Sequence, residues 1–245
     1  RRVQEVKPSP TLSLQARAKE LKAAGEKVMS LAAGEPDFET PEHIRKAAVE
    51  AMQAGHTGYA PSAGVPPLRE AVRNLYAKEL GLSYGDDQVV VSCSAKQCLF
   101  NAFQTLLDPG SEAIIQAPYW VSYPDMVRLA DGEPVIIKAG LEQRFKISPE
   151  QLDAAITPKT RLFVLNSPSN PTGVAYSRAE LEALAEVLLR HPHVLIATDD
   201  MYEHLVYDDF EFTTIAQVEP ALWERTLTIN GVSKAYAMTG WRIGY

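Results

Sequence analysis

The most informative stretch of the sequence is residues 233–245, which place one lysine and one arginine on a run of small residues. Lys234 follows Ser233, and Arg242 stands eight positions further on. A lysine amine forms a Schiff base with an aldehyde, and an arginine guanidinium grips a phosphate through paired hydrogen bonds. Pyridoxal 5′-phosphate carries both groups on one small molecule. A lone pair of this kind is more often an ordinary surface lysine and arginine, so the interpretation depends on the rest of the chain.

Segments typical of strands and of helices alternate through most of the chain. Strands are predicted at residues 89–92, 112–117, 134–138, 161–166, 194–199 and 226–232. Helices are predicted at residues 66–80, 95–107, 122–130 and 178–189, and cap signals start two more at Thr40-Pro41-Glu42 and Ser148-Pro149-Glu150-Gln151. Several strands are continuously apolar, as in parallel sheets covered on both faces. The pattern predicts an α/β fold with a mostly parallel, doubly wound sheet flanked by helices.

The first 37 residues do not follow this alternation. An amphipathic helix is predicted over residues 11–24, followed by the apolar segment 28–32 and a turn at residues 34–37. We therefore expect residues 1–37 to form an N-terminal segment that packs with a smaller domain. Residues 38–245 are expected to form the large, cofactor-binding domain.

Candidate site residues follow the predicted strands, at the edge where ligands of open α/β sheets bind. Asp199 could keep a pyridine nitrogen protonated, although a helix cap is the commoner role of such an aspartate. Two prolines and Gly173 rigidify the loop that aims the Asn170 amide, and Tyr202 could donate to the same phenolic oxygen. Trp120 offers a flat face for a heteroaromatic ring, although an aromatic residue is more often part of the core.

Small residues also open the predicted helix after residues 89–92. Ser94 and Ala95 leave backbone N–H groups free for an anion, and Lys96 lies in the first helical turn, against the helix dipole. That placement suggests a role toward an anionic ligand, although a solvated lysine is the default interpretation.

Composition limits the partners. The chain has 245 residues with 24 basic and 31 acidic side chains, a net charge of −7 and a pI of about 5.3. The basic residues do not cluster, and no apolar run is long enough for a membrane span, so neither nucleic acid nor membrane is expected as a partner. Cys93 and Cys98 are interpreted as a buried, reduced pair in the cytoplasm, and no metal site is predicted. The last residues, 243–245, look like the start of a strand, so we expect the chain to be incomplete at its C-terminal side.

Taken together, these residues resemble the class I aminotransferases of the pyridoxal-phosphate fold-type I superfamily, in the branch of bacterial aspartate and aspartate/prephenate aminotransferases. The resemblance spans nearly the whole chain. It rests on the segments Gly34-Glu35-Pro36-Asp37-Phe38, Tyr59 with Gly64, residues 166–173, Asp199-Asp200-Met201-Tyr202, and Ser233-Lys234 with Gly240-x-Arg242-x-Gly244.

The resemblance implies pyridoxal 5′-phosphate as cofactor and transfer of an amino group between aspartate, or a similar dicarboxylic amino acid, and a 2-oxo acid such as 2-oxoglutarate. Lys234 would bind the cofactor covalently and then move the proton, and Asp199 would pair with the pyridine nitrogen. The implied catalytic residues are Lys234, Asp199 and Tyr202; the cofactor would contact Ser94, Ala95, Lys96, Trp120, Asn170, Asp199, Tyr202, Ser233, Lys234, Arg242 and Tyr59; and the substrate would contact Gly34, Trp120, Asn170, Lys96 and Thr11.

Tyr59 would reach the phosphate from a second subunit, so the resemblance also implies a homodimer with shared active sites. Lys96, with Thr11, would bind the distal carboxylate of the substrate. Similar enzymes have cis prolines at the matching positions, so we predict cis peptide bonds before Pro118 and Pro171.

Three positions depart from the family pattern. Gly231 stands where many relatives have a phosphate-binding serine, Ser94 replaces a common glycine, and Asp200 replaces a common glutamate. The family's arginine for the α-carboxylate of the substrate lies in a C-terminal domain, beyond Tyr245. Two alternatives stay open: another fold-type I activity, similar to aminocyclopropane-carboxylate synthase or a β-lyase, and a non-catalytic domain that senses pyridoxal phosphate and regulates DNA binding.

Overall fold

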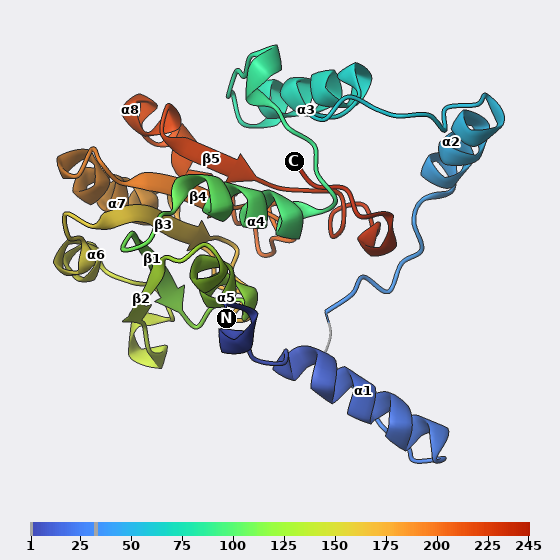
Figure 1. The fold of residues 1–245 in the computed structure, drawn as a ribbon, viewed down its shortest axis with the longest axis horizontal. Coiled ribbons are helices and arrows are strands. Elements are labelled where there is room, and N and C mark those ends of the chain that lie inside the picture. The colour runs from blue at the N-terminus through green and yellow to red at the C-terminus, as the bar shows by residue number, and fades with distance from the viewer. Residues whose placement is uncertain (1, 32–33) are drawn as a thin grey trace.

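A parallel sheet forms the centre of the computed structural model, which describes residues 2–31 and 34–245 (Figure 1). Within these residues the sheet has the strands β1 (Glu112–Ala117), β2 (Glu133–Lys138), β3 (Thr160–Asn166), β4 (Leu195–Asp199) and β5 (Thr226–Ile229). Their order is β2-β1-β3-β4-β5, and every neighbouring pair is parallel. The chain therefore builds outward from β1 in both directions, which confirms the predicted doubly wound α/β sheet.

Helices connect the strands and surround them. They are α1 (Pro10–Ala23), α2 (Glu42–Gln53), α3 (Pro66–Glu79), α4 (Ala95–Leu106), α5 (Ser122–Leu129), α6 (Pro149–Ala155), α7 (Arg178–Arg190) and α8 (Pro220–Trp223). Short 3₁₀ turns occur at η1 (Arg2–Glu5), η2 (Asp86–Gln88), η3 (Leu141–Gln143), η4 (Ile215–Gln217) and η5 (Thr239–Trp241). Each helix predicted from apolar spacing is present within one residue of its expected start.

The strands are buried on both faces, because successive side chains point to opposite sides of the sheet. In β3, Leu162 and Val164 pack with α4 and α5, whereas Phe163 and Leu165 pack with α6 and α7. Both sets are almost free of solvent contact. This two-sided burial explains the continuously apolar strand sequences and fixes the carboxyl ends of the strands along one edge.

The cap signals are correct for α6 but not for α2. Ser148 and Gln151 form the predicted capping box at the start of α6. At α2 the cap residue is Pro41, without a side-chain cap. The Thr40 hydroxyl instead donates to the carbonyl of Ala237 at 2.6 Å, far along the chain. A tertiary hydrogen bond thus replaces the expected local one.

Two strand predictions are wrong in extent. Residues 89–92 form no strand, because the segment that reaches them, residues 243–245, pairs only with Ser92. β5 ends at Ile229 rather than at residue 232, because the chain then turns away from β4. From Asn230 onward it pairs in the antiparallel sense with residues 243–245.

The crossing of residues 243–245 leaves no space for side chains at two glycines. A Cβ atom on Gly244 would lie 2.1 Å from the backbone nitrogen of Ala95, at the start of α4. A Cβ atom on Gly231 would lie 2.7 Å from the carbonyl oxygen of Ile243. Because real side chains do not approach so closely, glycine is required at Gly231 in this backbone. The departure from the family's serine therefore has a steric explanation.

The N-terminal helices lie apart from the sheet. Figure 1 shows α1 and α2 extending away from the body of the molecule, and neither has a buried residue. The helix predicted over residues 11–24 is present, but its apolar side chains Leu12 and Leu14 are exposed. In the predicted apolar segment 28–32, Ala32 lies outside the described residues, and residues 28–31 form no helix or strand.

Further predictions concern single residues. The peptide bonds before Pro118 and Pro171 are cis, as predicted, and so is the bond before Pro168, which was not predicted. Both cysteines are free, but Cys93 is exposed and Cys98 only partly buried, so the expectation of a buried pair is wrong. None of the helices in the described part of the chain is long and apolar enough to cross a membrane.

Candidate active site

A cavity of about 800 Å³ opens at the carboxyl edge of the sheet. It brings together residues from the ends of all the strands except β2, from the start of α4 and from the N-terminal segment. Of the predicted site residues, it is lined by Thr11, Gly34, Ser94, Ala95, Lys96, Trp120, Asn170, Asp199, Tyr202, Ser233, Lys234 and Arg242. Tyr59 is the exception, since its side chain is fully exposed outside the cavity.

Asp199 is the buried acid of this cavity and ends β4. Its Oδ2 accepts a hydrogen bond from the Tyr123 hydroxyl at 2.6 Å, and its Oδ1 accepts one from the backbone of Met201 at 3.3 Å. Burial raises the pKa of the Asp199 carboxyl, and the two donors oppose that rise. A cation next to this carboxylate would relieve the cost of burying its charge.

Asn170 and Tyr202 converge from two neighbouring strand ends. The Asn170 amide donates to the Tyr202 hydroxyl at 3.3 Å. Burial, and then the nearby Asp199 charge, raise the pKa of Tyr202, so its hydroxyl keeps the proton that it can donate. The two groups can therefore act together on one oxygen of a ligand.

Asn166 holds these strand ends in position. Its side-chain amide donates to the backbone carbonyl of Asp199 at 2.8 Å, and its side-chain oxygen accepts from the backbone of Asn170 at 2.7 Å. In the sheet, Asn166 and Asp199 are register partners. Asn166 thus connects the end of β3, the loop after it and the end of β4.

Lys234 is the half-buried amine of the cavity. Its Nζ donates to the carbonyl of Gly34, which comes from the N-terminal segment. Burial lowers the pKa of Lys234, and the charge of Glu35 opposes that shift. Partial burial therefore increases the fraction of neutral, nucleophilic amine at a given pH.

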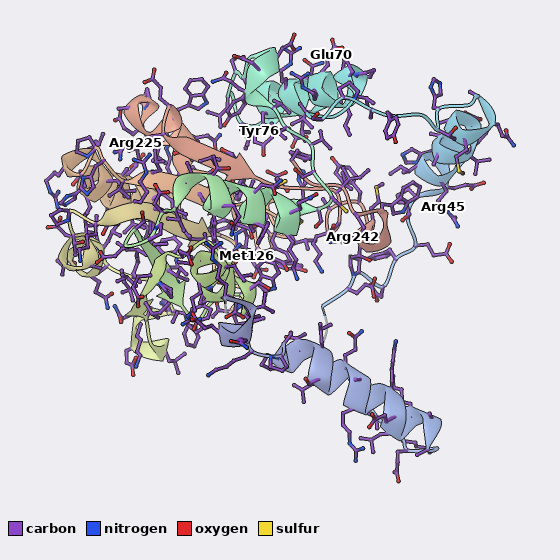
Figure 2. The ribbon with its side chains drawn as sticks, viewed as in Figure 1. Arg45, Glu70, Tyr76, Met126, Arg225 and Arg242 are labelled. Carbon is purple, nitrogen blue, oxygen red and sulfur yellow. The ribbon has the colours of Figure 1, made fainter. Side chains whose placement is uncertain are left out.

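The phosphate-sized end of the cavity combines Arg242 with the start of α4. In the part of the chain that the structure describes, the backbone N–H groups of Ala95 and Lys96 have no acceptor. Such free N–H groups at a helix start form an anion site together with the helix dipole. Arg242 lines the same cavity, and its Nη1 donates to the carbonyl of Thr239 at 2.6 Å. Figure 2 shows Arg242 near the carboxyl edge of the sheet.

Backbone strain accompanies this anion site. Ser94 has φ 80° and ψ 159°, a conformation that is almost restricted to glycine. Arg242 has φ 57° and Ala237 has φ 51°, both in the left-handed region. Strained residues of this kind persist where the surrounding structure fixes them, and they cluster at functional sites. At Ser94 the strain explains why the family's common residue is glycine.

Lys96 and Trp120 face each other across the cavity. The Lys96 ammonium lies 4.9 Å from the centroid of the Trp120 ring, which also packs edge-on against Tyr123. Burial, and then repulsion from Arg242, lower the pKa of Lys96. A second cation beside Arg242 is unfavourable unless an anionic ligand separates the two charges.

The N-terminal segment crosses the loop that carries Lys234 and Arg242. Besides the Gly34 contact, the Thr239 hydroxyl donates to the Glu35 carboxylate. Trp241 Nε1 donates to the Thr40 hydroxyl at 3.0 Å. These polar contacts close one side of the cavity with residues distant in sequence.

The residues present fit pyridoxal 5′-phosphate. Among the described residues, no lysine or arginine forms an ion pair with the buried Asp199 carboxyl, which suits a protonated ring nitrogen, and the free N–H groups at the start of α4 suit a phosphate. Lys234 supplies an amine for the aldehyde, and the Asn170–Tyr202 pair suits a ring oxygen. The cavity volume lies within the range of small-molecule sites.

Sequence reasoning missed two residues, Tyr123 and Asn166. Tyr123 is in α5, and nothing in its local sequence indicates that its hydroxyl reaches the carboxylate of Asp199. Asn166 directly follows the apolar run of β3, and that position at a strand end was a usable signal.

Fold and site together define a class: the chain has the fold and the site residues of pyridoxal-phosphate proteins of fold type I. The chain belongs to the family of class I and II aminotransferases, whose family model matches residues 26–245.

Named relatives agree with this assignment. The chain is 60% identical over 240 residues to an aspartate/prephenate aminotransferase of Cereibacter sphaeroides, a match that covers 98% of this chain and 60% of the relative. It is 54% identical over 244 residues to an aspartate aminotransferase of Rhizobium meliloti, covering 100% of this chain and 60% of the relative.

Solved structures agree as well. The aspartate aminotransferase of Rhizobium meliloti matches with a TM-score of 0.96 at 53% identity, covering 99% of this chain and 61% of that one. The enzyme of Thermus thermophilus with maleate matches with a TM-score of 0.94 at 48% identity, covering 99% and 62%. The chain thus spans about 60% of the length of these curated relatives.

We predict that Ser94→Gly stabilises the protein. Glycine removes a strain of about 1–3 kcal/mol and costs about 0.5–1 kcal/mol of backbone entropy, so a net gain of about 1 kcal/mol is expected. The gain in stability is measured by urea unfolding of the cofactor-free protein, whose midpoint should move to a higher urea concentration. Ser94→Ala is the matched control, since it removes the hydroxyl but keeps Cβ at the same φ, and it should give no gain. Equal effects of both variants would contradict the strain argument.

Proposed function

We propose that the whole protein is a pyridoxal-phosphate-dependent aminotransferase that moves an amino group between aspartate, or a similar dicarboxylic amino acid, and a 2-oxo acid such as 2-oxoglutarate. The observation that carries the proposal is the shared cavity of the Lys234 amine and the buried Asp199 carboxyl, with Arg242 and the start of α4 in its wall. Both relatives named above are called aminotransferases that act on aspartate, which supports aspartate as the substrate class.

In this proposal the chain holds the cofactor at several points. Arg242, Ser233 and the free N–H groups of Ala95 and Lys96 would hold the phosphate, whereas the N–H of Ser94 donates to the carbonyl of Ser92 at 2.8 Å. Trp120 would cover one face of the ring, Asp199 would hold a proton on the ring nitrogen, and Asn170 with Tyr202 would orient the ring oxygen. When bound, pyridoxal phosphate supplies an aldehyde for the amine and a ring that accepts electrons.

Lys234 would then act as the proton carrier. Its amine is half-buried, and that burial lowers its pKa, so a larger fraction of the amine is neutral and able to take a proton. Gly34, whose carbonyl accepts from Lys234 Nζ, would lie beside the substrate carboxylate. Tyr123 keeps the Asp199 carboxylate in one orientation through its hydroxyl.

The domain division and the compartment are also proposals. We propose that residues 1–37 pack with a smaller domain and that residues 38–245 form the large domain. The absence of buried residues in α1 supports a packing partner outside this part of the chain. The free thiols of Cys93 and Cys98 support a reducing compartment such as the cytoplasm.

A homodimer is supported by exposed apolar side chains in the first 60 residues. Phe38 and Tyr59 are largely exposed, and Val49 and Met52, which lie one turn apart on α2, are exposed as well. Neighbouring apolar side chains on a surface, such as those of Val49 and Met52, are typical of an interface. We propose that a second copy of the chain covers them and that Tyr59 reaches the phosphate of that copy.

Covalent labelling tests the central assignment. Borohydride reduction of the cofactor-loaded protein, followed by peptide mapping, should place the cofactor on Lys234, whose half-buried amine contacts the carbonyl of Gly34, whereas the Lys96 ammonium lies over the Trp120 ring. Lys234→Ala should still bind the cofactor but take no label, and its transamination rate should fall by at least about 10²–10⁴-fold. Label on Lys96, the other lysine of the cavity, would contradict the assignment.

The substrate class is tested at Lys96. A charge-assisted hydrogen bond to the distal carboxylate contributes about 1.5–3 kcal/mol, or about ten- to a hundredfold in kcat/KM. Lys96→Ala should therefore weaken activity on aspartate far more than on alanine and leave the cofactor spectrum unchanged. Lys159 lies outside the cavity, so Lys159→Ala should leave the activity on both substrates unchanged. An equal loss for both substrates would show that Lys96 has a structural or phosphate-binding role.

Shared active sites are tested with mixed dimers. A Tyr59→Phe subunit is combined with a Lys234→Ala subunit. If Tyr59 acts across the dimer, one of the two sites has both defects and the other is intact, so the mixture regains activity. If Tyr59 acts within its own subunit, each site keeps one defect, and the mixture shows no recovery above the parent variants.

A further inference from the structure

Asp200, the residue after the site aspartate, is a second buried carboxyl with a different environment. Its side chain is 1% exposed, and its backbone continues the pairing with β5 through an N–H bond to the carbonyl of Ile229 at 2.9 Å. Because side chains alternate along a strand, Asp199 lines the cavity while Asp200 does not. The chain therefore buries two adjacent carboxyls on opposite sides of one strand end.

The hydrogen bonds of Asp200 are incomplete for a carboxylate. The Thr198 hydroxyl donates to its Oδ1 at 2.6 Å. Its Oδ2 is buried and has no hydrogen-bond partner among the described residues, and no lysine or arginine forms an ion pair with it there. The hydroxyl oxygens of Thr214 and Tyr76 are buried nearby and likewise lack partners.

Acids and phenols surround Asp200. Glu203 is 8% exposed and lies one turn on, with its N–H donating to the carbonyl of Asp200 at 3.0 Å. Tyr76 of α3 is 5% exposed, and Figure 2 shows it between α3 and the β5 side of the sheet. The other titratable groups that act on this cluster are Asp199, Tyr84, Tyr123, Tyr236, Tyr245, Glu79 and His204. His204 Nε2 lies 3.4 Å from a carboxylate oxygen of Glu203 and 3.5 Å from one of Glu79, so its ring contacts those two acids.

A negative charge on Asp200 is therefore costly. It would lie in an apolar interior, beside Asp199 and Glu203, with one hydrogen-bond donor. A neutral carboxylic acid needs less solvation, and its O–H is a donor for one of the acceptors that now lack a partner. Burial raises the pKa of Asp200 to about 8 against the opposing effect of the Thr198 and Thr214 hydroxyl groups, and the charges of Glu203 and Asp199 add smaller contributions to the rise.

Asp199 has the opposite balance of contacts. Two donors bind its oxygens, and its free side faces the cavity, where a cationic ring nitrogen would lie under the proposed function. One anion and one neutral acid at this strand end avoid the repulsion between two adjacent buried charges.

We propose that Asp200 is a positioning residue: as a neutral carboxylic acid at physiological pH, it fixes the end of β4 between Thr198 and the buried hydroxyl groups and leaves Asp199 as the anion for the cofactor. The proposal rests on the proposed function only for the role of Asp199.

The protonation of Asp200 is tested without the cofactor. An acid whose pKa is about 3.9 when unfolded and about 8 when folded stabilises the fold fully below about pH 3.9 and loses that contribution as the pH rises toward 8. In this range unfolding releases about one proton from Asp200. The stability of the cofactor-free wild-type protein, measured by urea unfolding from pH 5 to pH 8, should therefore fall more steeply than that of Asp200→Asn. The difference in slope should correspond to about one proton. Equal slopes would overturn the proposal.

The positioning role is tested by cofactor affinity. Asp200→Asn keeps a neutral group that can hydrogen-bond on both sides, so it should retain cofactor binding. Asp200→Ala should weaken binding, because the end of β4 loses its anchor. Asp199→Asn is the adjacent control and should weaken binding by about ten- to a hundredfold, since it removes the charge. Loss of binding in Asp200→Asn equal to that in Asp199→Asn would show that Asp200 acts as an anion.

A spectroscopic measurement keeps the test valid if Asp200→Asn does not fold. Infrared spectra of the wild-type protein should contain the band of a protonated carboxylic acid at pH 6, and the band should fade as the pH rises through about 8. Absence of that band from the spectrum at pH 6 would overturn the proposal. The proton count and this band are both measured without the cofactor. They can therefore contradict the proposal for Asp200 while the aminotransferase assignment holds, and the aminotransferase assignment can be wrong while they agree with the proposal for Asp200.

Discussion

The side-chain amide of Asn166 is the interaction on which the site depends most. Parallel strands place their carboxyl ends at one edge, but backbone pairing ends there, and each chain must turn away. Asn166 connects the strand ends where the backbone hydrogen bonds of the sheet stop. Its side chain donates to the carbonyl of Asp199 and accepts from the backbone N–H of Asn170. The acid, the amide and the Tyr202 hydroxyl are thereby fixed relative to one another before any ligand binds.

A second constraint joins this edge to the anion site. Residues 243–245 run antiparallel between Ser92 and Asn230, with hydrogen bonds on both sides. Gly244 contacts the backbone at Ala95 so closely that a methyl group has no space. The arginine at position 242 and the start of α4 are therefore held together by backbone packing rather than by a side-chain contact. The positive φ angles of Ser94 and Arg242 are the local cost of this close crossing.

Much of the fold could be predicted because its signals are local. Buried parallel strands such as β3 are continuously apolar, and the capping box at Ser148 marks the start of α6. The predicted site residues also follow from position, since strand ends share one edge. Most of the failures involve long-range partners. Residues 89–92 have strand composition but pair at Ser92 alone, and Thr40 bonds Ala237 instead of capping α2. The role of Tyr123 at Asp199 and the strain at Ser94 depend in the same way on contacts between distant segments.

Burial shifts the pKa values of two key groups of the cavity in opposite directions, and in both cases it favours the neutral form. It lowers the pKa of the Lys234 ammonium and raises the pKa of the Asp199 carboxyl, so each is driven toward its neutral form. For Lys234 the neutral form is the reactive one, so burial alone prepares it. For Asp199 the useful form is the anion, which becomes favourable when a cationic nitrogen enters the cavity. A cation in the cavity therefore favours the charged form of Asp199, whereas burial favours the neutral amine of Lys234 without any ligand. The different surroundings of these groups, fixed by Gly34 and Tyr123, allow one cavity to favour a neutral base and to hold an anion for a cationic ligand.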